Sequence, residues 1–144
     1  REHVTGGTGA THRLSLHWTR KGVTGAQAQG DWTGVATVLQ GDSPRLINYD
    51  GIDVEAELDG TLLIMRNHDV PGVIGRIGTI LGEHGVNIAN FALGRATRSH
   101  YVPNGQALAL VQIDVQNASE AYPAIEALRK VEAIASVRLV ELEK

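Results

Sequence analysis

The stretch that decides the fold runs from residue 67 to residue 91 and reads NHDVPGVIGRIGTILGEHGVNIANF. It joins a polar loop, a glycine-spaced apolar segment and a segment that begins with asparagine. In the middle segment, five apolar residues recur at the spacing of one helix face, which predicts a helix from Pro71 to His84 that Gly85 can end. Proline suits the first turn of such a helix. The five residues are Val73, Ile74, Ile77, Ile80 and Leu81.

The segments on either side of this helix extend the pattern to the end of the chain. A second amphipathic helix is predicted from Ser119 to Val131, and Asn117 is placed to cap it. The predicted strands are Leu62 to Arg66, Val86 to Thr97, Gln106 to Val115 and Ala135 to Leu142. The order is βαββαβ, so we expect an α+β, ferredoxin-like domain at residues 61–144 with both helices on one face of the sheet.

The first half, residues 1–60, has a different character. Short stretches at 13–18, 32–39 and 52–58 alternate polar and apolar residues, and glycines separate them, which predicts a small β-rich segment. Its few large apolar residues make a thin core, so we expect this segment to lean on the second half or on an upstream part. Because the chain opens with Arg1, we expect a piece of a longer protein; an expression remnant is the alternative.

Composition narrows the function classes. Hydrophobic residues make up 42% and charged residues 20% of the chain, and the formal charge is -3, which is typical of a globular domain and argues against nucleic acid as a partner. The sequence has no cysteine, and the six histidines show no ligand spacing, so no metal site is predicted. No apolar run is long enough for a membrane span and no signal peptide is recognised. We therefore expect a cytoplasmic protein.

The polar residues around the first helix suit the capture of a free amino acid. Asp69 can accept hydrogen bonds from an ammonium group, and the N–H groups at the helix start favour a carboxylate. The side-chain amides of Asn67 and Asn87 can add donors. Two simpler roles stay open: Asp69 as a cap of the helix, and Asn87 as a partner of the turn that precedes its strand.

Three glycines, Gly75, Gly78 and Gly82, lie close together on one face of the first helix. Each costs the helix about 1 kcal/mol relative to alanine, so close packing must compensate. The glycines can let the helix sit tightly on the sheet, or they can form a close helix contact across a dimer with the ligand beside it.

At these residues the sequence resembles the ACT domain, a βαββαβ module that senses small molecules. The stretches RNHDVPGVIGRIG and GEHGVNIAN, followed by Leu93-Gly-Arg, are similar to the ACT domain of bacterial D-3-phosphoglycerate dehydrogenases, and the resemblance covers Leu62 to Leu142. Upstream, residues 34–41 and 44–55 resemble the tail of the intervening, allosteric substrate-binding domain of the longer members. The acidic residues Asp53, Glu55 and Glu57 depart from the basic pattern of some members, so no anion site is carried over.

The resemblance implies a regulatory fragment of an NAD-dependent enzyme of L-serine biosynthesis, with L-serine as the feedback effector. Catalysis and NAD would belong to the parent enzyme, because the fragment carries no catalytic site. The domains would pair as a homodimer or homotetramer, with Asn87 of the neighbouring subunit holding the effector's carboxylate or hydroxyl. The effector site would comprise Asn67, Asp69, Val70, Pro71, Gly72 and Asn87. Relatives often have His or Tyr at the position of Asn67.

Two other interpretations stay open. The ACT region of a serine dehydratase-type enzyme has a similar pair of domains, and an ACT module can serve assembly alone. An RNA-binding βαββαβ sheet would need aromatic residues on its central strands, and Leu62 to Arg66 and Gln106 to Val115 contain none.

Overall fold

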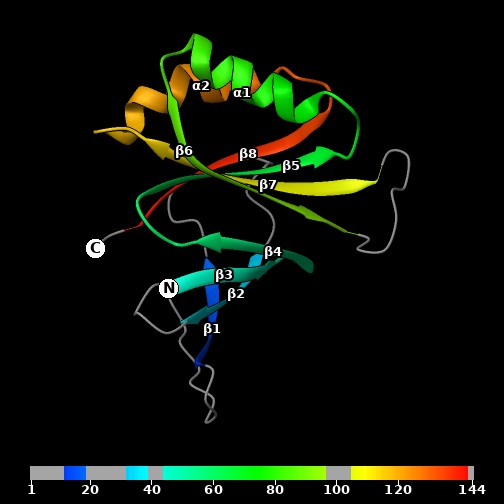
Figure 1. Ribbon diagram of the computed structural model, residues 1–144, viewed down its shortest axis with the longest axis vertical. Coiled ribbons are helices and arrows are strands. Elements are labelled where there is room, and N and C mark those ends of the chain that lie inside the picture. The colour runs from blue at the N-terminus through cyan, green and yellow to red at the C-terminus, as the bar shows by residue number, and fades with distance from the viewer. Residues whose placement is uncertain (1–11, 19–31, 39–43, 97–104, 143–144) are drawn as a thin grey trace, which may run out of the picture.

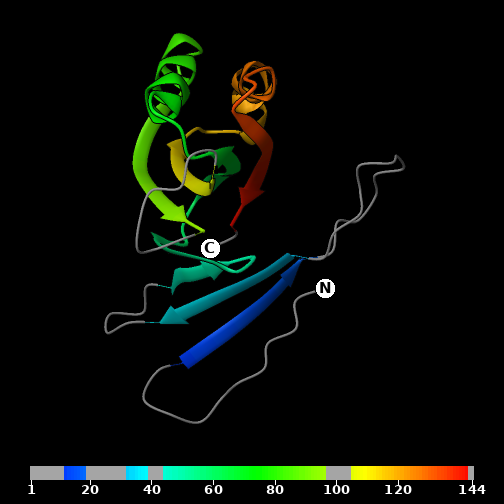
Figure 2. The same ribbon diagram turned by 90° about the vertical axis from the view of Figure 1, so that its right-hand side faces the viewer.

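The computed structural model describes residues 12–18, 32–38, 44–96 and 105–142. Within these ranges the chain forms two four-stranded sheets, one from each half of the sequence. Two helices cover the outer face of the second sheet, and the first sheet lies against its other face (Figure 1). Seen from the side, the strands β1 and β2 extend away from the second sheet, whereas β4 lies next to it (Figure 2).

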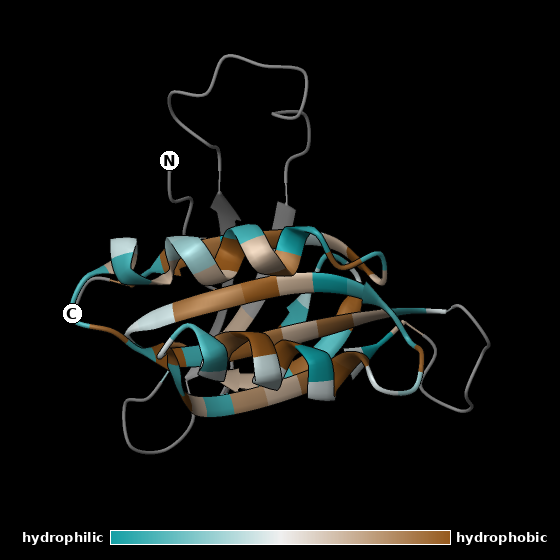
Figure 3. Ribbon diagram, turned by 90° about the horizontal axis from the view of Figure 1, so that it is seen from above, coloured by the Kyte–Doolittle hydropathy of each residue, from teal (hydrophilic) through white to brown (hydrophobic). Residues whose placement is uncertain are grey.

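The second sheet has the predicted βαββαβ order. Its strands are β5 (Thr61–His68), β6 (Asn87–Arg95), β7 (Gln106–Asp114) and β8 (Ile134–Glu141). All neighbours are antiparallel, and the order across the sheet is β6-β7-β5-β8. Helices α1 (Val73–Glu83) and α2 (Tyr122–Arg129) lie side by side above it, so the ferredoxin-like prediction is confirmed (Figure 3).

The first sheet is a meander of β1 (His12–Trp18), β2 (Trp32–Val38), β3 (Pro44–Tyr49) and β4 (Ile52–Glu57). The sequence did not predict β3, because its apolar residues do not alternate strictly and its pairing shifts register between Leu46 and Asn48. The turn between β3 and β4 consists of Asp50 and Gly51, which both have positive φ angles, as a two-residue hairpin of type I′ requires. We refer to β3, this turn and β4 as the β3–β4 hairpin.

Two apolar cores lie on opposite faces of the second sheet. The helix-side core contains Leu63, Met65, Ile77, Leu81, Ala109, Val111, Ile125 and Leu128, among others. The hairpin-side core contains Leu46, Tyr49, Ile52, Val54, Ala56, Ile64, Leu108 and Leu110. The segment from residue 1 to 60 was expected to lean on the second half, and in its described part the β3–β4 hairpin does so.

The helices differ from their predicted bounds at their starts. α1 begins at Val73, two residues after Pro71, because Gly72 has a left-handed φ of 87° and cannot belong to a right-handed helix. The second helical segment begins as a 3₁₀ turn, Ala118–Ala121, which the side chain of Asn117 caps as predicted. No helix of the described ranges is long and apolar enough to cross a membrane.

The three glycines of α1 do not serve close packing on the sheet. A β-carbon added at Gly75, Gly78 or Gly82 would have no neighbouring atom within 4 Å. Ile74, predicted on the buried face, is 43% exposed. The first interpretation of the glycines is therefore wrong for this chain, and the helix face that carries them is open.

Leu46 and Ile47 test how much the hairpin-side core contributes to stability. Leu46 is fully buried and Ile47 is 38% exposed. We expect Leu46→Ala to lower the free energy of unfolding by about 2–5 kcal/mol, because it leaves a cavity between the sheets. Ile47→Ala serves as the matched control and should cost less than about 1 kcal/mol, because a partly exposed side chain buries less apolar area. Urea titration followed by circular dichroism measures both; similar losses would contradict this packing.

Candidate ligand site

A cavity of about 380 Å³ opens where β5 ends, α1 begins and β6 ends. This volume is within the range of ~300–1,000 Å³ that is common for small-molecule sites. Nine residues line it: Asn67, Asp69, Val70, Pro71, Gly72, Val73, Ile74, Leu93 and Arg95. Five of the six residues predicted for the effector site are among them; the exception is Asn87.

Asp69 is held in the loop between β5 and α1 by its backbone and its side chain. Its N–H group donates to the carbonyl oxygen of Gly105 at 2.7 Å. Its carboxylate forms an ion pair with Arg95, with 2.9 Å between Oδ2 and Nε. The side chain of Asp69 is 15% exposed and that of Arg95 is 49% exposed. A largely buried carboxylate and a half-exposed cation therefore lie together at the cavity.

The start of α1 supplies donors to the same cavity. Gly72 occupies the N-cap position, and no side chain caps the helix, so the simpler interpretation of Asp69 as a cap is not what the structure shows. The N–H groups of a first helical turn have no acceptor within the helix. Together with the helix dipole they favour an anionic group at this end of α1.

Asn67 presents an unsatisfied acceptor. Its side chain is 2% exposed, and its Nδ2 donates to the carbonyl oxygen of His68 at 2.9 Å. Its Oδ1 is buried and has no hydrogen-bond partner. A buried acceptor without a partner costs about 1–3 kcal/mol. Because Asn67 lines the cavity, a ligand with an N–H or O–H group can supply the missing bond.

Asn87 lies elsewhere in the chain. It is the first residue of β6 and Arg95 is the last, so about 26 Å separate them along the strand. The Nδ2 atom of Asn87 donates to Oδ2 of Asp114 at 2.7 Å. Asn87 can therefore join Asp69 around one ligand only if it comes from a second copy of the chain, as the resemblance implies.

Arg95 is the charged residue among the four lining residues that the sequence did not predict for the site; the other three, Val73, Ile74 and Leu93, are apolar. Its signal lies in the pairing of the strands, because Asn67 on β5 and Arg95 on β6 both face Ala107 on β7. Both residues thus lie at the same end of the sheet, beside the polar loop. The local sequence around Arg95 contains no such information, since β6 reaches this edge only after the sheet has formed.

These groups match the charges of an α-amino acid. Asp69 and Asn67 Oδ1 are acceptors for an ammonium group, and Arg95 and the start of α1 are donors for a carboxylate. A guanidinium carries five N–H donors, so Arg95 keeps donors for a ligand while it contacts Asp69. Apolar side chains, including Val70 and Leu93, limit the remaining space. Within the described ranges, no three His, Asp or Glu side chains gather as a metal site.

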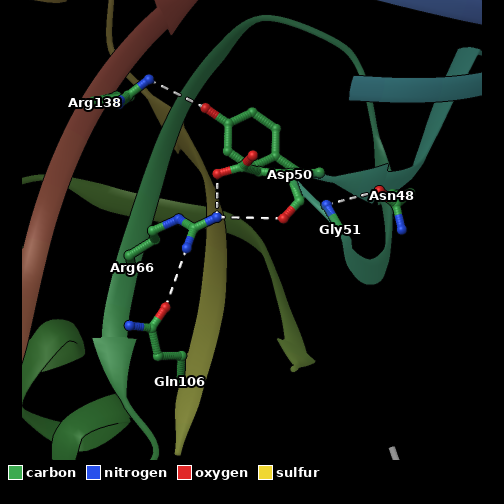
Figure 4. Close-up of polar contacts among 7 residues, drawn as sticks. Asn48, Asp50, Gly51, Arg66, Gln106 and Arg138 are labelled. Carbon is green, nitrogen blue, oxygen red and sulfur yellow. Dashed lines mark hydrogen bonds and ion pairs between the residues drawn. The ribbon is translucent and has the colours of Figure 1, made fainter. Parts of the chain in front are cut away.

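A second polar cluster lies on the opposite face of the sheet, under the β3–β4 hairpin (Figure 4). Arg66 contacts the carboxylate of Asp50, and Arg138 donates to the hydroxyl of Tyr49 at 3.4 Å. Burial raises the pKa of the Tyr49 hydroxyl and lowers the pKa of the Arg138 guanidinium. The adjacent cavity has only about 10 Å³, close to the size of one water molecule, so this cluster is structural rather than a ligand pocket.

Comparison with known families and proteins places these features in context. The sequence profile of the ACT domain family matches residues 61–132, which is half of the chain. The chain is 30% identical to D-3-phosphoglycerate dehydrogenase of Methanocaldococcus jannaschii over 68% of its own length and 18% of that protein. It is 32% identical to the Archaeoglobus fulgidus enzyme of the same name, over 71% of this chain and 18% of that protein.

A longer match, over 77% of this chain and 20% of that protein, is 29% identical to D-3-phosphoglycerate dehydrogenase of Bacillus subtilis. The chain thus spans about a fifth of the length of these curated relatives. Among solved structures, the ACT domain of the GTP pyrophosphokinase of Chlorobium tepidum covers 57% of this chain, and the match covers 97% of that domain, with a TM-score of 0.45 and 18% identity.

Gly72 allows a test of the left-handed backbone conformation at the start of α1, where the cavity lies. A β-carbon there meets no atom within 4 Å, so a substitution changes only the cost of the left-handed backbone. We expect Gly72→Ala to lower the free energy of unfolding by about 1–2 kcal/mol. Gly72→Asn is the matched control and should lose less, because asparagine tolerates this conformation better. Thermal unfolding measures both, and equal losses would contradict the conformational explanation.

Proposed function

Because this chain belongs to the ACT domain family, we propose that it is a regulatory region that binds a free α-amino acid, L-serine, in the cavity around Asp69. The observation that carries the proposal is the meeting of Asp69, Arg95 and the unsatisfied Oδ1 of Asn67 at the start of α1. These groups supply acceptors and donors within one small cavity, as a zwitterion requires.

Each end of the zwitterion has its own partners in this proposal. Asp69 and Asn67 accept hydrogen bonds from the ammonium group, and the ligand satisfies the acceptor that is otherwise buried without a partner. Arg95 donates to the ligand carboxylate with the N–H groups that do not contact Asp69, and the N–H groups of the first turn of α1 also favour that carboxylate. Glycine and alanine share the zwitterion, so the preference for L-serine rests on the relatives' role in serine synthesis.

The region also assembles into a homodimer or homotetramer in this proposal. Two copies would pair at sheet edges, which hides unpaired backbone groups. The open glycine face of α1 allows a close contact with a helix of the second copy. Ile74 and Leu93 are exposed apolar residues at the cavity rim, and a second copy would cover them. That copy would also bring its own Asn87 to the ligand.

The parent enzyme would be an NAD-dependent D-3-phosphoglycerate dehydrogenase, whose catalysis takes place outside this chain. L-Serine would then act as a feedback inhibitor. It can do so only if it binds one arrangement of the subunits better than another, because equal affinity shifts no equilibrium.

Calorimetry with L-serine tests the ligand. We expect saturable binding of L-serine, weaker binding of glycine and D-serine, and none of 3-hydroxypropionate, which lacks the ammonium group. Asp69→Ala should weaken L-serine binding by about 10–100-fold, because it removes a charged hydrogen-bond acceptor. Asp59→Ala, at an exposed turn outside the cavity, is the control and should bind as the unmodified chain does.

Two outcomes would contradict this assignment. Undiminished L-serine affinity in Asp69→Ala would refute the role of Asp69. Absence of binding by a chain that is a dimer in solution would favour a region used for assembly alone, or a different effector.

Gly78 tests the assembly. Gly78→Leu fills the open glycine face, where an added β-carbon meets no atom within 4 Å, and leucine favours the helix more than glycine does. We therefore expect a folded chain whose dimer is weakened at least tenfold, measured by analytical ultracentrifugation. Glu83→Leu places the same side chain on another flank of α1 and should leave the dimer intact. An unchanged dimer in Gly78→Leu would exclude the glycine face as the interface.

A further inference from the structure

Residues that alternate along β5 and β6 connect the cavity to the opposite face of the sheet. Successive side chains of a strand point to opposite faces. Asn67, Leu93 and Arg95 line the cavity on the helix side. Their neighbours Arg66 and Gly94 therefore face the β3–β4 hairpin. β5 and β6 thus contact the hairpin through Arg66 and Gly94, which are direct sequence neighbours of residues that line the cavity.

At Gly94 the hairpin backbone lies directly against β6. Gly94 is buried, and a β-carbon there would overlap the main-chain oxygen of Asp53. It would also lie 3.1 Å from Cγ2 of Ile52 and 3.1 Å from Cβ of Val54. Backbone atoms cannot move aside as the end of a side chain can. The position of β4 therefore directly limits the position of β6 between Leu93 and Arg95.

At Arg66 the turn of the hairpin is bound to β5. The guanidinium contacts the carboxylate of Asp50 and donates at 3.1 Å to Oε1 of Gln106 (Figure 4). Gln106 follows Gly105, whose carbonyl oxygen accepts from the N–H group of Asp69. The turn itself is held by Asn48, whose Oδ1 accepts from Gly51. A displacement of the hairpin turn would thus be transmitted to β5 next to Asn67.

From these two contacts we infer that the β3–β4 hairpin sets the geometry of the ligand cavity, with Gly94 and Arg66 as positioning residues, and that it responds in turn to a bound ligand. The response to a ligand rests on the proposed function; the positioning does not. By linkage, a hairpin that alters ligand affinity must itself be stabilised or destabilised by the ligand to the same extent. Through the hairpin, ligand binding in the cavity is then coupled to the strands that precede the hairpin, because β3 pairs with β2.

The test uses the whole chain and four variants. Gly94→Ala pushes β4 from β6, and Arg66→Gln removes the ion pair while keeping a polar side chain. Arg66→Lys retains the positive charge, so its cavity resonances and L-serine affinity should stay close to those of the unmodified chain. Arg129→Gln removes an exposed ion pair on α2, with Glu126, and is the matched control. Thermal unfolding first establishes which variants fold. If Gly94→Ala does not fold, Arg66→Gln and Arg66→Lys still test whether the hairpin positions the cavity residues.

Three readouts separate positioning from simple stability. Without ligand, the Asn67 side-chain amide and the Arg95 Nε–H resonances report the cavity; they should shift in Gly94→Ala and Arg66→Gln but not in Arg129→Gln. L-Serine affinity should fall about two- to fivefold in Arg66→Gln, as expected for a partly exposed ion pair, and more in Gly94→Ala. In the unmodified chain, L-serine should slow amide hydrogen exchange in β4, which does not line the cavity.

The outcomes distinguish this inference from the proposed function. Unchanged Asn67 and Arg95 resonances in folded variants would overturn the positioning role, whether or not serine binds. Shifted resonances with unchanged serine affinity would overturn the response to ligand. Shifted resonances in a chain that binds no serine would refute the proposed ligand and support the positioning role.

Discussion

Burial of the central strands β5 and β7 on both faces is the constraint on which the rest of the structure depends. Helices α1 and α2 cover one face and the β3–β4 hairpin covers the other. Strands buried on both faces carry continuous apolar runs instead of alternating ones, and the run from Leu62 to Met65 has this form. Loss of either cover would expose half of these side chains, so the hairpin belongs to the core of the molecule although it precedes the ACT domain.

The site lies where this apolar sandwich ends. β5 changes within two residues from buried Met65 to Arg66 and Asn67, and each polar residue serves a different face. Asn67 lines the cavity and has a buried oxygen without a partner, whereas Arg66 contacts the hairpin turn. Since polar groups at the margin of a core must find partners, the same end of the sheet provides both a ligand site and a docking point for the hairpin.

The loop before α1 shows what the sequence could and could not indicate. Asp69 was expected at the site because it stands before an amphipathic helix, and the resemblance implied Gly72 there; both line the cavity. The partner of Asp69 was not expected. Arg95 is 26 residues further along the chain, and only the pairing of β6 with β7 brings it back to the loop. The same pairing carries Asn87 away from Asp69, so a sequence motif that contains both residues does not form one site within a chain.

By itself, the sequence determined the order of helices and strands in residues 61–144, the amphipathic face of α1 and the polar loop at its start, because helical and strand periodicity and turn residues act over a few neighbouring positions. Only the tertiary structure decided that the β3–β4 hairpin covers the second face of the sheet, that Gly94 must be glycine for β4 to approach, and that Arg95 pairs with Asp69. These features depend on contacts between distant segments, which local periodicity does not encode.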